Sequence, residues 1–259
     1  RAVNAFYQRW YRPENTVIVV VGDVDTKILA ALTEKWFGDW KGVGRRVAAP
    51  DFGDPVAPRG PDRDNPVGQT GVLVEPDLPR SYTYAVMRPW RQVNDTIVYN
   101  QGLMVDAVAQ SIINRRLESR ARAGGSYLYA QVSQDDVSRS ADATFVTFAP
   151  LTQDWQAALV DVRAVIADAQ SAPPTQEEID REVAEIDVAF ASAVEQRSVM
   201  AGSRLADDIV QAVDIRETVA SPETVLQVFR DTKPRFTPQS VLEHTRKLFD
   251  GDVIRSVYV

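Results

Sequence analysis

The sequence predicts an α+β fold, in which a largely antiparallel sheet carries helices packed on one face. The first reason is the order of its segments: strand patterns come in adjacent pairs between helices instead of alternating with them one by one. The second is composition, because 44% of the 259 residues are hydrophobic and can bury a substantial core without disulfides or a metal.

The first segments have the patterns of a helix, a strand and a second helix. An aromatic-rich helical pattern over 2–11 stops ahead of Pro13, since the residue before a proline is disfavoured in a helix. The continuous β-branched run at 17–21 is typical of a strand buried on both faces. Asp25 or Thr26 can cap the helix that follows.

A long connection and two strands come next. Residues 41–70 are rich in glycine, proline, aspartate and arginine and show no periodicity, so we expect an extended surface loop there. Residues 70–75 and 81–88 are expected to be strands, and the second alternates in the manner of a strand with two different faces.

The longest periodic pattern spans 95–123, where apolar residues recur at helical spacing up to the stop signal Gly124-Gly125. Residues 127–134 and 143–149 then alternate around a polar turn and predict a hairpin.

Helices and one strand complete the chain. An amphipathic helix over 155–169 precedes a helix that Thr175 and Glu178 begin with a capping-box pattern. Further helices are expected to begin near residues 204, 221 and 237, and a terminal strand is expected over 252–259.

Charge and residue counts exclude several classes of function. A net charge of −7 disfavours nucleic acid as a partner, because an acidic domain gains no long-range attraction to phosphates. No apolar run approaches the roughly 20 residues of a membrane-spanning helix. The chain has no cysteine and a single histidine, His244, so it cannot supply two imidazole ligands to a catalytic zinc. We therefore expect no catalytic residue and no metal ligand, and we place His244 at the flank of a helix.

Three stretches carry a resemblance to a known family. Residues 6–40, FYQRWYRPENTVIVVVGDVDTKILAALTEKWFGDW, resemble the junction at which the zinc domain of pitrilysin-like (M16) peptidases passes into the next domain. Further on, IINRRLESRARAGGSY resembles the family's helix end with Asn-x-Arg-Leu-x-x-x-Arg, and PPTQEEIDREV resembles its proline-led capped helix.

The resemblance implies the non-catalytic second domain of such a peptidase, of the bacterial long-chain type and with the metallohydrolase fold that LuxS and the mitochondrial processing peptidase share. Residues 1–14 would be the tail of the preceding zinc domain and its linker helix, and 15–259 the non-catalytic domain, with 41–70 as its surface loop. The family's His-x-x-Glu-His zinc motif lies upstream of this junction. Zinc is therefore expected in the upstream domain of the parent protein, and no cofactor in this chain.

The implied function is that of a fragment of a zinc-dependent M16 metalloendopeptidase, which would be inactive alone and would form part of the substrate chamber wall or a domain interface. The alternative is a domain of a catalytically dead M16-like binding or assembly subunit. Expected partners are the upstream zinc domain, the downstream half of the same parent and a peptide substrate. An exported parent would place the domain in the periplasm, and the cytoplasm is left open.

Arg120 and Tyr127 are the candidate substrate-binding residues. In the family an arginine and a tyrosine at this spacing, in the half that faces the zinc, hold the substrate peptide. There a glycine directly precedes the tyrosine, whereas Ser126 does so here. The alternative interpretation is a helix-end cation and a strand aromatic.

Arg115, Arg116 and Arg122 crowd the last turns of the same helix. Cations are favoured at a helix C-terminus by about 0.3–1 kcal/mol each, which alone can explain them. The second interpretation is a basic contact patch for an acidic partner or for the carboxylates of a peptide.

Overall fold

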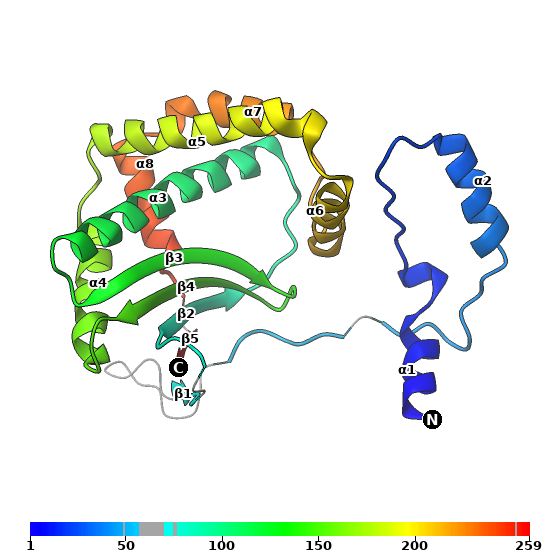
Figure 1. Ribbon diagram of the computed structural model, residues 1–259, viewed down its shortest axis with the longest axis horizontal. Coiled ribbons are helices and arrows are strands. Elements are labelled where there is room, and N and C mark those ends of the chain that lie inside the picture. The colour runs from blue at the N-terminus through cyan, green and yellow to red at the C-terminus, as the bar shows by residue number, and fades with distance from the viewer. Residues whose placement is uncertain (49, 57–69, 75–76, 252) are drawn as a thin grey trace. The chain divides into compact units, whose positions relative to one another are not determined.

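A computed structural model describes residues 1–48, 50–56, 70–74, 77–251 and 253–259. The chain divides into two compact units (Figure 1). The first comprises Arg1–Phe52 and Ser198–Val219, and the second comprises Gly53–Arg197 and Ala220–Val259. The domain boundary expected after residue 14 lies inside the first unit.

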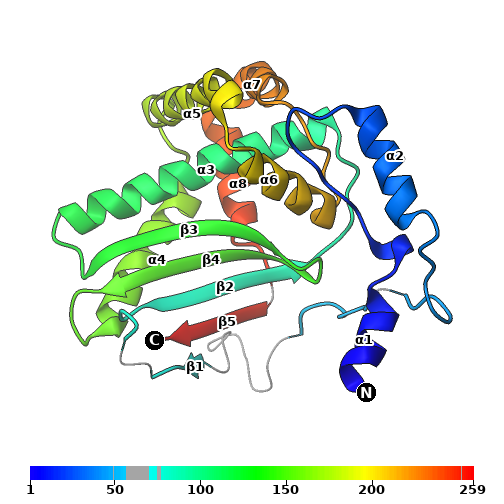
Figure 2. The ribbon, with the colours of Figure 1, turned by 45° about the vertical axis from the view of Figure 1, so that its right-hand side comes forward.

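The second unit holds a five-stranded sheet in the order β1-β5-β2-β4-β3 (Figure 2). Its strands are β1 (Thr70–Val72), β2 (Tyr82–Pro89), β3 (Tyr127–Val137), β4 (Ala141–Pro150) and β5 (Val253–Tyr258). Neighbouring strands are antiparallel, except that β1 and β5 run parallel. The last strand of the chain is therefore inserted between the first two, and β3 lies at an edge.

Helices cover one face of this sheet. They are α3 (Ile97–Arg122), α4 (Trp155–Ser171), α5 (Gln176–Gln196), α7 (Pro222–Asp231) and α8 (Pro238–Leu248). In Figure 2, α3 lies over the sheet, and α5 and α7 form a further layer beyond it. The predicted α+β class with a largely antiparallel sheet and helices on one face is thereby confirmed.

Local signals explain where these helices begin and end. The Thr96 hydroxyl accepts a hydrogen bond from the Tyr99 amide at the start of α3, and Thr175 and Glu178 form the predicted capping box of α5. After α3, Gly124 has a φ of +89°, a conformation that residues with a side chain rarely adopt. The chain can therefore turn directly from α3 into β3.

The core lies between the sheet and α3. Buried side chains of α3 face buried residues of the strands, of α4 and of α5, and the innermost of them are Val105, Val108, Ile113, Leu117, Val132, Val146, Phe148, Val162 and Ile179. Burial of each such side chain stabilises the fold by about 1.5–3 kcal/mol. The amphipathic stripes seen in the sequence are thus the core-facing stripes.

The regular elements among the described residues of the first unit are all helical. They are α1 (Ala2–Trp10), the 3-10 turn η1 (Pro13–Asn15), α2 (Thr26–Phe37), most of the 3-10 turn η2 (Arg197–Val199) and α6 (Gly202–Ile215). Asp25, one of the two expected caps, accepts hydrogen bonds from the first-turn amides of α2. The buried Arg12 guanidinium donates to the carbonyls of Val43, at 2.7 Å, and Gly44, at 3.1 Å, and so fixes the chain after α2.

Two expectations at the N-terminal side need correction or stay open. The predicted strand at 17–21 is wrong, because no strand is formed in the described part of the first unit. A β-branched run favours an extended backbone, but a strand also requires a pairing partner. Of the expected loop at 41–70, residues 41–48 and 50–56 have no helix or strand, whereas 49 and 57–69 lie outside the described residues.

Candidate functional site

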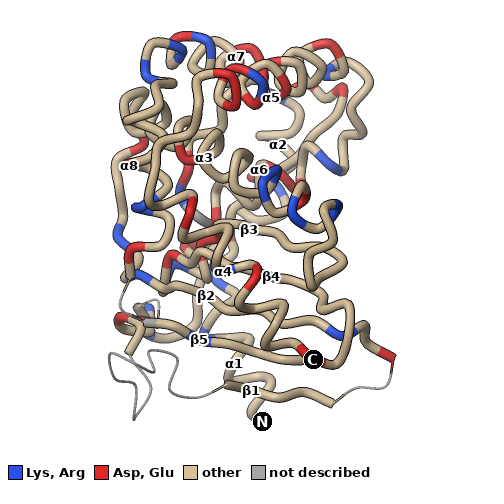
Figure 3. The backbone as a smooth tube through the Cα atoms, turned by 90° about the vertical axis from the view of Figure 1, so that its left-hand side faces the viewer, with Lys and Arg blue, Asp and Glu red and all other residues tan. Residues whose placement is uncertain are grey.

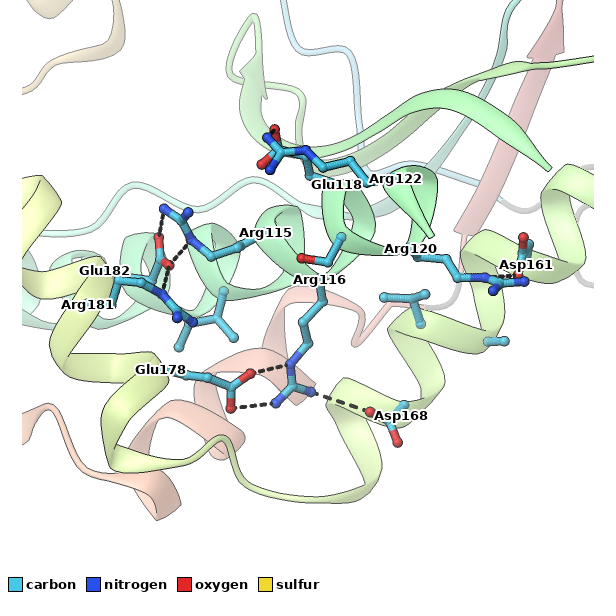
Figure 4. Close-up of a pocket in the computed structure, with 14 residues that line it drawn as sticks. Arg115, Arg116, Glu118, Arg120, Arg122, Asp161, Asp168, Glu178, Arg181 and Glu182 are labelled. Atoms are coloured by element: carbon cyan, nitrogen blue, oxygen red, sulfur yellow. Dashed lines mark hydrogen bonds and ion pairs between the residues drawn. The ribbon is translucent and has the colours of Figure 1, made fainter. Parts of the chain in front are cut away.

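The C-terminal half of α3 carries all but one of the predicted site residues, and two grooves flank it; Figure 4 shows the groove that Arg116, Arg120 and Glu178 line. We call the space between α3, α4 and α5 the helix groove; its volume is about 820 Å³. We call the space between α3 and the outer edge of β3 the edge groove; its volume is about 720 Å³. Arg115 and Arg122 line both grooves.

Arg120 joins the end of α3 to α4. Its Nε donates to Asp161 Oδ1 at 2.7 Å, and the other carboxylate oxygen of Asp161 accepts from the Ser126 amide at 2.9 Å. The Arg120 hydrogen bond, followed by that of the Ser126 amide, holds the pKa of Asp161 below its usual value against the opposing effect of burial. One carboxylate therefore holds together the end of α3 and the start of β3.

Tyr127 lies in the core and is 1% exposed. Its hydroxyl donates to the carbonyl of Leu117 on α3 at 2.8 Å. Burial raises the pKa of Tyr127 to about 12. The structure thus brings Arg120 and Tyr127 to the same α3–β3 corner, where both make contacts within the domain; their role toward substrate stays a prediction.

Arg116 bridges three elements. Its Nε and Nη2 donate to the two carboxylate oxygens of Glu178 at 2.9 and 3.1 Å, and its Nη1 lies 3.5 Å from Asp168 of α4. Glu178 Oε2 also accepts from the Thr175 amide at 2.9 Å as part of the capping box. These bonds, led by that of Arg116, lower the pKa of Glu178. The same carboxylate begins α5 and ties it to α3.

Arg115 and Arg122 are also paired. Arg115 donates to both carboxylate oxygens of Glu182, whose side chain is 5% exposed, and also to Glu185 at 2.5 Å. Arg122 pairs with Glu118 one turn earlier on α3, and both side chains are exposed to solvent. Blue and red segments interleave over the helices in Figure 3. The predicted basic patch is therefore a mosaic of both charges, and its role as a contact surface stays a prediction.

The edge groove contains a residue that sequence reasoning did not assign. The Asn114 side-chain amide donates to the Val132 carbonyl at 3.0 Å and accepts from the Val132 amide at 2.7 Å. Asn114 thereby occupies the position that a neighbouring strand would take. Because backbone groups alternate in direction along an antiparallel strand, those of Ala130 and Gln134 also point away from β4.

His244 pairs with a buried carboxylate between α3 and α8. Its Nδ1 lies 2.7 Å from Asp106 Oδ1, and Lys247 lies 3.6 Å from the other oxygen. Asp106 is 4% exposed, so these two partners compensate for its burial. Within the described residues no group of three or more His, Cys, Asp or Glu could hold a metal ion, and no helix there is long and apolar enough to cross a membrane.

Comparisons with known proteins decide the family. The model of the family described as peptidase M16 inactive domain matches residues 1–186. The chain belongs to the peptidase M16 inactive domain family. A search of curated proteins finds no match to this M16 domain.

Solved structures share the fold of this M16 domain. The periplasmic protease PqqL from Escherichia coli superposes with a TM-score of 0.81 at 18% identity, covering 99% of this chain and 28% of PqqL. The first half of PqqL gives 0.79 at 18% identity, covering 99% and 53% of the two chains. A predicted insulinase family protease from Yersinia pestis gives 0.77 at 16% identity, covering 99% and 54%. The M16 domain thus spans about half or less of these structures.

Three residues at the site were missed by sequence reasoning. Asn114 stands inside the Asn-x-Arg-Leu stretch that carries the family resemblance, and Glu182 follows Glu178 by one helical turn, so both had a signal in the sequence. Asp161 gave none, because its partner Arg120 is 41 residues away.

Proposed function

We propose that this M16 inactive domain is a fragment of a larger zinc-dependent metalloendopeptidase, in which it forms part of the substrate chamber wall or a domain interface. Family membership carries the proposal. The chain covers 53% of the first half of PqqL, which supports a parent protein with at least one more domain. The zinc and its ligands would come from the upstream domain. An exported parent would place this domain in the periplasm, and PqqL is a periplasmic protease.

The first test compares the isolated chain with its parent protein. The chain alone is expected to hold no stoichiometric zinc by metal analysis and to cleave no unfolded peptide, and the parent is expected to do both. Zinc bound tightly by the chain alone would refute the assignment of the zinc site to the upstream domain. A parent without zinc and without cleavage would instead favour the alternative, a binding or assembly subunit.

For the contact with substrate we propose the edge groove. β3 is an edge strand, and its Ala130 amide and carbonyl point away from β4, so an extended peptide can add to the sheet there through backbone hydrogen bonds. Leu128, 66% exposed, and Tyr129, 50% exposed, supply apolar contact area beside it.

The charged wall of the edge groove fits the same use. Arg122 is 76% exposed and pairs with the exposed Glu118, and such a surface pair contributes only about 0.2–1 kcal/mol. Arg122 can therefore exchange Glu118 for a carboxylate of the peptide at little cost. This gives Arg122, one of the three predicted basic contact residues, a specific role, and leaves Arg120 and Tyr127 to position the start of β3.

Two substitutions with opposite expected effects test the edge groove. A labelled unfolded peptide, such as reduced insulin B chain, is titrated against the chain while fluorescence anisotropy is recorded. Ala130→Pro removes an outward amide that an edge strand can lose without breaking its own pairing, and it should weaken binding about threefold to tenfold. Asn114→Ala frees the Val132 backbone for one more pair and should strengthen binding by a similar factor. Equal affinities for both variants and the unaltered chain would exclude strand addition at this edge.

A further inference from the structure

One side chain of α3 interrupts the outer edge of β3. The Asn114 side-chain amide donates to the Val132 carbonyl at 3.0 Å and accepts from the Val132 amide at 2.7 Å. A primary amide offers the same kinds of donor and acceptor as a peptide group. Asn114 therefore makes the two hydrogen bonds that a residue of a neighbouring antiparallel strand would make with Val132.

The edge groove ends where Asn114 is bonded. On the side of β3 the groove is lined by residues 128–131, and the next residue, Val132, is 0% exposed. At the other end, the register of β3 against β4 shifts between Tyr127 and Tyr129, and such a bulge interrupts regular pairing. An extended chain advances by about 3.4 Å per residue, so the open stretch takes about four residues of a peptide.

The edge of β3 becomes available again beyond Asn114. The backbone groups of Gln134 point away from β4, as do those of Ala130, and the two residues lie about 14 Å apart along the strand. A long added strand would pair with Ala130, Val132 and Gln134 in turn. The middle one of these three residues already has its partner within the domain.

Displacement of Asn114 gives an added peptide no advantage. At Val132 the peptide would form two hydrogen bonds, but the two bonds of Asn114 would be broken, so their number would not change. Each further peptide residue held in place also loses conformational freedom. An added strand should therefore stop beside Gln131.

We propose that Asn114 limits a peptide added to β3 to the stretch 128–131, so that the edge groove selects short extended segments of an unfolded chain and excludes a long added strand. β3 itself is 11 residues long and could otherwise pair over more of its length. The inference rests on the proposed function, because it requires that a peptide adds to the sheet at the edge groove.

Hydrogen exchange of the Ala130 and Gln134 amides, with and without saturating reduced insulin B chain, tests the limit. With peptide bound to the unaltered chain, the Ala130 amide should exchange about tenfold or more slowly, and the Gln134 amide within about twofold of its rate in the free chain. Slower exchange at Gln134 would overturn the inference but leave strand addition in place. No change at either residue would refute strand addition, and the inference with it.

A matched pair of substitutions assigns the limit to Asn114. Asn114→Ala and Ser111→Ala both change α3 where it lines the edge groove, but only the first removes the bonds to Val132. With peptide bound, Asn114→Ala should extend the protection to Gln134, again by about tenfold, and Ser111→Ala should keep the pattern of the unaltered chain. Rates are compared with and without peptide within each variant, so that a loss of stability does not enter.

A Gln134 amide that gains no protection in peptide-bound Asn114→Ala would count against Asn114 as the limiting residue. If Asn114→Ala does not fold, the exchange pattern of the unaltered chain still decides whether an added peptide stops ahead of Val132.

Discussion

Replacement of Asn114 by alanine would expose how the free edge of the sheet is held. The substitution removes two hydrogen bonds, to the amide and to the carbonyl of Val132, a residue with no exposed surface. A net loss of about 0.5–1.5 kcal/mol per bond gives about 1–3 kcal/mol in the free energy of unfolding. The loss should lie in the upper half of this range if no water takes the place of the Asn114 side chain, because the Val132 amide and carbonyl are then left without partners.

Urea denaturation of the isolated chain measures this loss, and hydrogen exchange locates it. The Val132 amide should exchange faster in Asn114→Ala, whereas amides that point toward β4, such as that of Gln131, should keep their protection relative to global unfolding. Asn114→Asp is the matched control. Its carboxylate still accepts a hydrogen bond from the Val132 amide, but it has no donor for the Val132 carbonyl. An unchanged unfolding free energy together with an unchanged Val132 exchange rate would refute the assignment of Asn114 as the edge cap.

Three further outcomes are expected of the isolated chain. Arg120→Ala should leave the urea midpoint of unfolding nearly unchanged, because its guanidinium is 45% exposed and Asp161 keeps its bond from Ser126; a large fall of the midpoint would contradict this. The pKa of Asp161 is lowered on folding, so its contribution to the free energy of unfolding is present above the unfolded pKa and is lost as pH falls through the folded pKa. In Asp161→Asn the stability should therefore fall less steeply as the pH is lowered through this range. The pKa of Tyr127 is raised to about 12, so stability should fall as pH rises from about 10 to 12, and Tyr127→Phe should remove that fall while it loses about 1 kcal/mol at neutral pH.

Local patterns predicted most of the second unit. The helical stripe over 95–123 and its glycine stop gave α3 to within a few residues, and the capping pattern of Thr175 and Glu178 placed the start of α5. Alternation placed β3 and β4. These signals are short in range, since periodicity and caps depend on neighbours within a few residues.

Partner choice could not be predicted in the same way. The β-branched run at 17–21 predicts an extended, buried segment, but its residues do not indicate which strand would pair with it. The arginines at the end of α3 could be assigned to the helix dipole, yet their carboxylate partners come from α4 and α5 through tertiary packing. Asn114 likewise gains its meaning only when α3 lies along the edge of β3.

The double use of Glu178 makes one corner of the fold cooperative. Its carboxylate accepts the Thr175 amide that begins α5 and both donors of Arg116 from α3, so the first turn of α5 and its attachment to α3 share a single acceptor. Replacing Arg116 leaves the carboxylate to the Thr175 backbone amide alone, and a thermodynamic cycle on Arg116 and Glu178 should give a coupling energy different from zero. The start of α5 and its attachment to α3 are consequently coupled through one side chain, so that loss of Glu178 weakens both together.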